Sequence, residues 1–128
     1  MKTFTKSFRL NASAEDIYAC LTNPYTIELW SGYPATMPAE PGGDFTIFEG
    51  DISGRLINLV PGKVIEHEWF FGKQNKPSPV KITLTEKGGV TELKVEQSEI
   101  PDEDFQNISE GWKDQIVDGI ASFLNPNF

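Results

Sequence analysis

The chain has one histidine and one cysteine, and these two candidates for acid–base, nucleophilic or metal chemistry lie far apart in the sequence. His67 is the only histidine and Cys20 the only cysteine. A general base or a nucleophile needs partner groups within hydrogen-bond reach, and no nucleophile motif surrounds either residue. A zinc site needs several ligands at workable spacing, which one histidine and one cysteine on separate elements do not supply. The sequence therefore predicts no catalytic residue, no metal site and no cofactor.

His67 lies in an apolar segment whose alternation is typical of a strand. The alternation places His67 on one face with Ile65 and Trp69, and places Glu66 and Glu68 on the opposite face, toward solvent. One interpretation is a polar group that orients a ligand or shuttles a proton inside a cavity. The other is a core histidine that is hydrogen-bonded to a neighbouring strand or helix. The sequence leaves both open.

Length, composition and charge limit the number of domains, the partners and the cellular location that we expect. A chain of 128 residues is long enough for one domain, which we expect to span 1–128 and to bury roughly two-thirds of its unfolded surface. The net charge of -8 repels phosphate backbones, so we expect no nucleic-acid partner. We find no signal peptide and no run of ~20 apolar residues, and therefore expect a cytoplasmic protein without a membrane span. Cys20 is interpreted as a small buried residue, with a reactive thiol as the alternative.

The first part of the chain predicts a strand and two short helices. Residues 3–11 alternate in polarity as a strand does. Ser13 suits a helix N-cap, with Asp16 three residues later as its partner. That helix should stop at Asn23-Pro24, which then suit the N-cap and first position of a second short helix that carries Trp30.

The middle of the chain predicts an antiparallel meander. Gly32 to Gly43 is rich in proline and indicates an irregular edge strand and loop, and Gln74 to Pro79 indicates a polar loop. Gly88-Gly89 is a two-residue hairpin turn, because glycine tolerates positive φ. Gly54 lies within a strand, where glycine often marks a bulge or bend. Strands are expected at about 44–49, 52–60, 63–71, 80–87 and 90–98.

A long amphipathic helix completes the predicted fold. Apolar residues recur at three- and four-residue spacing after an acidic N-terminal triplet. These residues are Phe105, Ile108, Trp112, Ile116, Ile120 and Phe123. Only this helix is long enough to cover the concave face of a curved sheet, so we expect an α+β, helix-grip fold, with the sheet wrapped around it. Such a shape can leave a gap where small molecules bind.

Several short segments, in order along nearly the whole chain, resemble the signature of a known family. They are Gly43-Asp44-Phe45, Asp51-Ile52-Ser53-Gly54, Leu59-Val60-Pro61-Gly62-Lys63, Trp69, Ile82-Thr83-Leu84, Thr91-Glu92-Leu93, Ile100-Pro101 and Gly111-Trp112. The chain is similar to the C-terminal domain of the activator of the ninety-kilodalton heat-shock protein ATPase (AHSA-type). This family belongs to the START-like, birch-pollen-allergen-like (SRPBCC) superfamily. The resemblance implies a helix-grip sheet around a cavity.

The resemblance and the residues together leave three functional hypotheses. The first is a non-catalytic domain that binds a small hydrophobic ligand between the sheet and the C-terminal helix. The second is a co-chaperone that binds a heat-shock chaperone and activates its ATPase, in a stress response. The third is an enzyme for a hydrophobic substrate, which would need a second polar group facing His67. The expected cavity residues are Trp30, Phe45, Ile47, Leu56, His67, Trp69, Leu84, Leu93, Trp112 and Ile116. The tryptophans either line a pocket or fill it.

Overall fold

One antiparallel sheet and a helix that packs on it make up the fold, in a computed structural model that describes residues 1–72 and 74–125. The strands are β1 (Lys2–Leu10), β2 (Asp44–Ile47), β3 (Ile52–Val60), β4 (Val64–Trp69), β5 (Ser78–Lys87) and β6 (Val90–Ile100). They lie in the order β1-β6-β5-β4-β3-β2. The helices are α1 (Ala14–Thr22), α2 (Pro24–Ser31), η1 (Asp102–Asp104), α3 (Phe105–Gly111), η2 (Trp112–Val117) and α4 (Asp118–Leu124). The expected α+β helix-grip architecture is confirmed.

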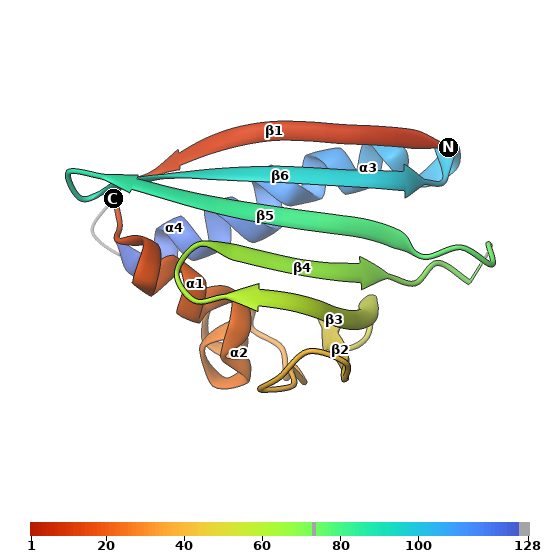
Figure 1. The fold of residues 1–128 in the computed structure, drawn as a ribbon, viewed down its shortest axis with the longest axis horizontal. Coiled ribbons are helices and arrows are strands. Elements are labelled where there is room, and N and C mark those ends of the chain that lie inside the picture. Colours follow the sequence, from red (N-terminus) through yellow and green to blue (C-terminus); the bar gives the residue numbers. More distant parts are fainter. Residues whose placement is uncertain (73, 126–128) are drawn as a thin grey trace.

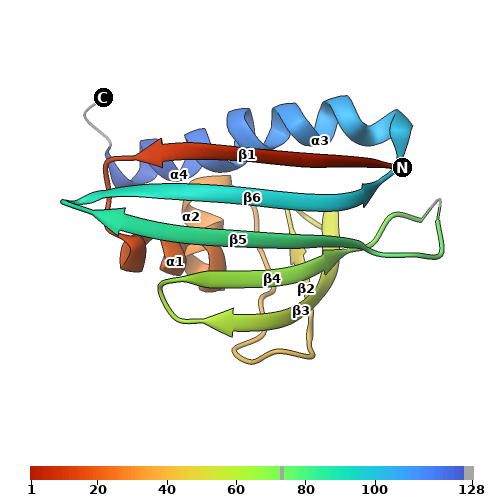
Figure 2. The same ribbon diagram turned by 45° about the horizontal axis from the view of Figure 1, so that its top comes forward.

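The last three helical segments follow one another without a break, and we call them together the C-terminal helix. Figures 1 and 2 show it running along one face of the sheet, with α4 near the end of β1 and α3 near the N-terminus. The ammonium group of Met1 lies 3.0 Å from the carboxylate of Asp102, which ties the start of β1 to η1, the short segment just before this helix. Helices α1 and α2 pack against α4, at the end of the C-terminal helix that is farthest from α3.

The caps of α1 and α2 form as their sequence predicts. The hydroxyl of Ser13 accepts a hydrogen bond from the backbone N–H of Asp16 at 3.1 Å. The side-chain oxygen of Asn23 accepts one from the N–H of Tyr25 at 2.9 Å, and Pro24 occupies the first turn of α2. These caps satisfy backbone donors that have no partner within the helix. They therefore fix the entry of α2, on which Trp30 lies.

The meander forms largely as expected, with shifted strand ends. Gly88 and Gly89 have φ of 61° and 78°, as a two-residue hairpin turn requires. Strand β5 begins at Ser78, not at residue 80, and Pro79 lies inside it opposite Glu68. The hydroxyl of Ser78 donates to the carbonyl of Ser98, which extends the pairing with β6. Residues 32–43 form no strand, only an isolated bridge between Thr36 and Thr46.

Gly54 makes a close contact and does not mark a bulge. It pairs regularly with Trp69 of β4, and the register irregularity of β3 lies between Leu56 and Asn58. A Cβ atom at Gly54 would lie 1.7 Å from the carbonyl oxygen of Glu68 and 2.9 Å from the ring of Phe45. Glycine is needed here because the backbone of β4 and an aromatic ring occupy the space of a side chain.

The C-terminal helix departs from the expected continuous α-helix. Its middle segment, η2, is π-helical, and a π-helix has more residues per turn than an α-helix. The buried face therefore shifts: Val117 is buried beside Ile116, while Phe123 is 37% exposed although the regular spacing predicted it on the apolar face.

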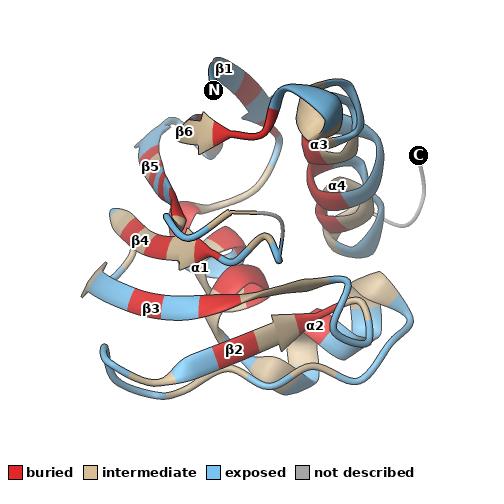
Figure 3. Cartoon of the chain, turned by 90° about the vertical axis from the view of Figure 1, so that its right-hand side faces the viewer, coloured by how far each residue is buried: buried red, intermediate tan, exposed pale blue. Residues whose placement is uncertain are grey.

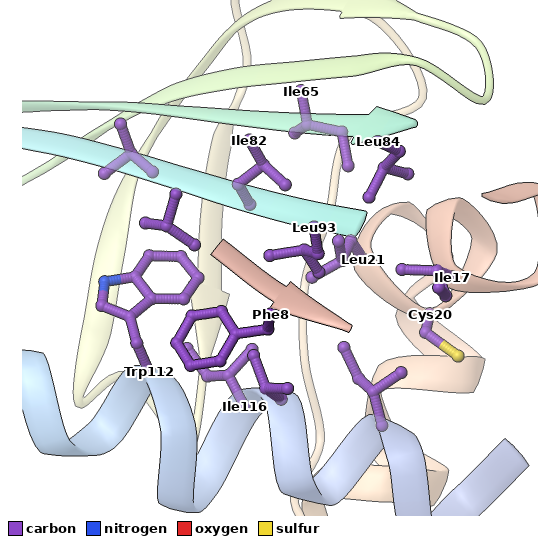
Figure 4. Packing of buried hydrophobic residues seen from close by; sticks show 14 of the residues in the cluster. Phe8, Ile17, Cys20, Leu21, Ile65, Ile82, Leu84, Leu93, Trp112 and Ile116 are labelled. Carbon is purple, nitrogen blue, oxygen red and sulfur yellow. The ribbon is translucent and has the colours of Figure 1, made fainter. Parts of the chain in front are cut away.

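Side chains fill the space between the sheet and the C-terminal helix. Figure 4 shows Trp112 and Ile116 projecting from the helix toward Phe8, Leu93 and Ile82 of the strands. Figure 3 shows buried positions along each strand and along the helix, and the turn between β2 and β3 lying below the helix beside α2. A pocket large enough to hold a ligand must therefore open at the side of this core.

Candidate functional site

An open cleft of about 990 Å³ lies at the side of the grip. Its walls are the C-terminal helix, the turn between β2 and β3, and the end of α2. The lining residues are Trp30, Ser31, Tyr33, Phe48, Glu49, Asp51, Ile52, Trp69, Asn107, Ile108, Glu110, Gly111, Trp112, Asp114, Gln115 and Ile116. Three elements that are distant in sequence therefore form one concave surface.

Aromatic rings form the wall that joins α2 to the β2–β3 turn. The ring of Phe48 contacts that of Trp30 edge to face, with centroids 5.9 Å apart, and that of Tyr33 at 6.4 Å. The indole N–H of Trp30 donates to the carbonyl of Cys20 at 2.7 Å. A Cβ atom at Gly119 would lie 3.0 Å from this indole, so α4 can approach Trp30 because residue 119 is glycine. Trp30 is thus held in place from both sides.

The turn that carries Phe48 has a strained backbone. Phe48 and Glu49 both have φ of 55°, in the left-handed region that costs a non-glycine residue of order 1–2 kcal/mol. Gly50 follows with φ of 90°. Such strain persists only where the surrounding structure enforces it. Here the ring contacts of Phe48 hold the turn against the aromatic wall.

The floor of the cleft is a stacked pair of tryptophans. Trp69 of β4 and Trp112 of η2 lie with ring centroids 5.2 Å apart and an interplanar angle of 19°. The indole N–H of Trp112 donates to the side-chain oxygen of Gln97 at 2.7 Å, and the amide of Gln97 donates to the hydroxyl of Ser78 at 3.1 Å. This buried chain of hydrogen bonds fixes the helix side of the floor to the sheet.

His67 supports this floor from beneath and does not line the cleft. Its Nδ1 accepts the indole N–H of Trp69 at 2.9 Å, and its ring centroid lies 4.9 Å from that of Phe45. Burial lowers the pKa of His67 from 6.5 to about 3. The imidazole is therefore neutral near pH 7 and serves as a hydrogen-bond acceptor. The partner is on its own strand, whereas the sequence suggested a neighbouring strand or helix.

Carboxylates lie on two opposing walls of the cleft. Glu49 and Asp51 come from the β2–β3 turn, and Glu110 and Asp114 come from the C-terminal helix. All four side chains are exposed. The ammonium group of Lys113 lies 3.8 Å from the carboxylate of Asp114.

The ten residues expected to line a cavity separate into two groups. The four that line the cleft are Trp30, Trp69, Trp112 and Ile116, and the last three of these are also buried in the core. The six that lie in the packed core are Phe45, Ile47, Leu56, His67, Leu84 and Leu93. Sequence reasoning missed that Phe48, Ile108 and four carboxylates line the cleft. Ile108 could have been found from its spacing of four residues to Trp112. The sequence indicates a turn at Glu49-Gly50-Asp51, but nothing in it signals the positive φ of Phe48 or the ring contacts of that residue.

The described residues offer no other candidate chemistry of comparable strength. Within them, no group of three or more His, Cys, Asp or Glu side chains could hold a metal ion. Burial, followed by the charge of Asp16, raises the pKa of the Cys20 thiol to about 12, which makes the thiol a poor nucleophile. A second hollow of about 360 Å³ lies along the strands, bordered by His67 and by outward-facing residues such as Glu66. In residues 1–72 and 74–125 no helix is long and apolar enough to cross a membrane.

Comparison with known proteins supports the resemblance. Residues 11–125 match the family described as Activator of Hsp90 ATPase homolog 1-like protein. The chain is 34% identical over 110 residues to Activator of 90 kDa heat shock protein ATPase homolog 1 of Homo sapiens, which covers 84% of the chain and 32% of that protein. It is 31% identical over 126 residues to the corresponding activator homolog of Dictyostelium discoideum, covering 93% of the chain and 33% of that protein. The chain thus spans about a third of these curated relatives.

Solved structures share the fold. The crystal structure of an HSP90 activator from Plasmodium falciparum superposes with a TM-score of 0.89 at 23% identity, covering 98% of this chain and 97% of the other. The solution structure of an Aha1 dimer from Colwellia psychrerythraea gives 0.79 at 16% identity, covering 95% of each. The order of elements and the sequence match agree, and the chain belongs to the family of Activator of Hsp90 ATPase homolog 1-like proteins.

Proposed function

We propose that this domain is a binding module that holds a small, largely apolar ligand in the cleft beside the C-terminal helix. The observation that carries the proposal is that all three tryptophans of the chain, Trp30, Trp69 and Trp112, line this one cleft. Its volume of about 990 Å³ is at the upper end of the range of small-molecule pockets. Burial of apolar ligand surface there contributes ~25 cal/mol per Å² to affinity.

The proposed site differs in position from the cavity first expected between sheet and helix. That interior is filled, and Phe45, Leu56 and Leu93 are 0% exposed. A ligand would therefore enter from the open side and contact Trp30, which is partly exposed, above the buried indoles of Trp69 and Trp112.

A steric block tests the proposal. Gly111 lines the cleft and has helical φ and ψ of -63° and -34°, and a Cβ atom added to it would meet no other atom within 4 Å. Gly111→Leu should therefore fill the cleft without opening the core. Ser122→Leu, an exposed position on α4 outside the cleft, is the matched control.

The readout is tryptophan fluorescence during titration with phenylbutanol, a neutral apolar probe. We expect saturable change in the wild type and Ser122→Leu, and a loss of at least tenfold in affinity in Gly111→Leu. Equal binding to Gly111→Leu would remove the cleft as the site. A native mass spectrum of the purified protein beside a denatured one adds an independent measure, because mass present only in the native spectrum is a bound ligand.

A second candidate function is favoured by the family match. The curated relatives are named as activators of the 90 kDa heat-shock protein ATPase, and this chain aligns with about a third of their length. On this proposal the domain contacts an HSP90-class chaperone and alters its ATPase rate. The net charge of -8 would steer the domain toward a basic surface of the partner.

The chaperone proposal is tested by binding and ATPase assays with a purified HSP90-class chaperone. We expect binding that weakens as salt rises from about 0.05 to 0.5 M, because exposed charges are screened over a shorter distance. We also expect a change in ATPase rate on addition of the domain. No binding would end this candidate, and binding that is indifferent to salt would end its electrostatic form.

A further inference from the structure

The charges that line the cleft all have one sign. Two carboxylates, Glu49 and Asp51, lie on the β2–β3 turn, and two more, Glu110 and Asp114, lie on the facing helix. The described lining residues include no lysine, arginine or histidine. We propose that the cleft selects small ligands that carry a positive charge on an apolar body, such as an arylalkyl amine. The inference rests on the proposed ligand site and adds the charge that the site prefers.

The hydrogen bonding of the tryptophans also favours a cationic ligand over an anionic one. Each of the three indole N–H groups donates to an acceptor of the protein: Trp30 to the Cys20 carbonyl at 2.7 Å, Trp69 to His67 at 2.9 Å, and Trp112 to Gln97 at 2.7 Å. None is therefore available to bind an anion. Trp30 is partly exposed and offers ring surface to the cleft, whereas Trp69 and Trp112 are 4% and 2% exposed. A cation within about 6 Å of an aromatic ring gains roughly 0.5–1 kcal/mol at an exposed site.

The negative charge of the cleft is only partly balanced. The ammonium group of Lys113 donates a hydrogen bond to the carboxylate of Asp118 at 3.1 Å and lies 3.8 Å from that of Asp114, and these contacts raise the pKa of Lys113. Lys113 does not line the cleft. The side-chain amide of Gln106 donates to Glu110 at 3.2 Å, which leaves the charge of Glu110 in place. An anionic ligand would meet carboxylates on both walls.

A matched series of probes tests the sign of the preferred charge. Phenylbutylamine, phenylbutanol and phenylbutyrate share one apolar body and differ in a positive, neutral or negative end group. Their binding is followed by fluorescence of the three cleft tryptophans and by chemical-shift changes in amide spectra. We expect the amine to bind about tenfold more tightly than the alcohol, as one or two cation–π and charge contacts would give. The carboxylate should bind more weakly than the alcohol, and salt should reduce the advantage of the amine.

Neutral variants separate the cleft from the overall charge of the protein. The double variant Asp51→Asn, Glu110→Gln removes one carboxylate from each wall. The control double variant Glu40→Gln, Glu92→Gln removes two exposed carboxylates outside the cleft and changes the net charge equally. We expect the amine to lose most of its advantage over the alcohol in the cleft variant and to keep it in the control. Circular dichroism verifies that both variants fold.

Each outcome decides a different claim. Equal affinity for amine and alcohol would overturn the charge preference while leaving the cleft as a ligand site. An equal loss in both double variants would assign the preference to net charge and would overturn the role of the cleft. If no probe binds, the charge preference and the proposed ligand site both fail. Loss of chaperone binding in the cleft variant, without amine binding, would assign the cleft to the chaperone instead.

Discussion

Replacing Gly54 with alanine tests whether the close contact between β3 and β4 determines stability. Gly54 has no left-handed φ, so its backbone tolerates alanine and the effect isolates the contact. The new Cβ would lie 1.7 Å from the carbonyl oxygen of Glu68, and real Cβ atoms essentially never approach within 3.0 Å. It would also lie 2.9 Å from the ring of Phe45, which is 0% exposed and has no free space to move into.

The expected loss follows from what must move. The obstacle is backbone, so β3 and β4 must separate locally, and ladder hydrogen bonds worth about 1 kcal/mol each weaken or break. Displacement of Phe45 in a packed core adds about 1–3 kcal/mol. We therefore expect Gly54→Ala to lower the free energy of unfolding by about 3 kcal/mol, which corresponds to a fall in Tm of about 10 °C for a domain of this size.

The assay is urea denaturation followed by tryptophan fluorescence, with a thermal melt by far-ultraviolet circular dichroism. Gly111→Ala is the matched control, since Gly111 is helical and a Cβ there meets nothing within 4 Å. We expect Gly111→Ala to be more stable than wild type by about 0.5–1 kcal/mol, because glycine is a poor helix former. Neutral surface substitutions change the free energy of unfolding by up to about 0.5 kcal/mol. If Gly54→Ala changes it by no more than this, the close contact with Glu68 and Phe45 does not determine stability.

Two further predictions follow from the buried titratable groups. The pKa of His67 is about 3 in the fold and 6.5 when unfolded, so the unfolded chain binds more protons below pH 6.5 and stability falls as pH drops toward 3. The variant His67→Gln keeps an acceptor for the indole N–H of Trp69 but cannot titrate. Between pH 7 and 5, we expect its free energy of unfolding, measured by urea titration, to fall by about 2 kcal/mol less than that of the wild type. Equal losses in the two proteins would contradict this. Cys20 is 0% exposed and its pKa is raised to about 12, so a thiol reagent should label it only in urea, and rapid labelling of the native protein would refute its burial.

The sequence was sufficient for most of the fold because its signals are local. Ser13 and Asn23-Pro24 set helix starts through caps formed within three residues. Gly88 and Gly89 set a hairpin through their own φ angles. The alternation in β4 placed His67 and Trp69 on the buried face, because side chains of a strand alternate whatever their partners are.

The errors arose where distant segments decide the local structure. Gly54 was interpreted as a bend because nothing near it in sequence reveals that the Glu68 carbonyl and the Phe45 ring occupy the place of its side chain. Phe123 was placed on the buried face because the period of an α-helix was extended through η2, which is π-helical. Both features depend on packing, and a pattern of spacing does not record packing.

The sequence by itself therefore determined the order of elements, the helix-grip class and the identity of three aromatic residues that line the cleft, Trp30, Trp69 and Trp112. Only the tertiary structure decided that the interior is filled and that the cleft opens beside the C-terminal helix. It also brought Glu49 and Asp51 opposite Glu110 and Asp114. The physical reason is that capping, turns and alternation act over a few residues, whereas a cleft is the space left after three distant segments have packed.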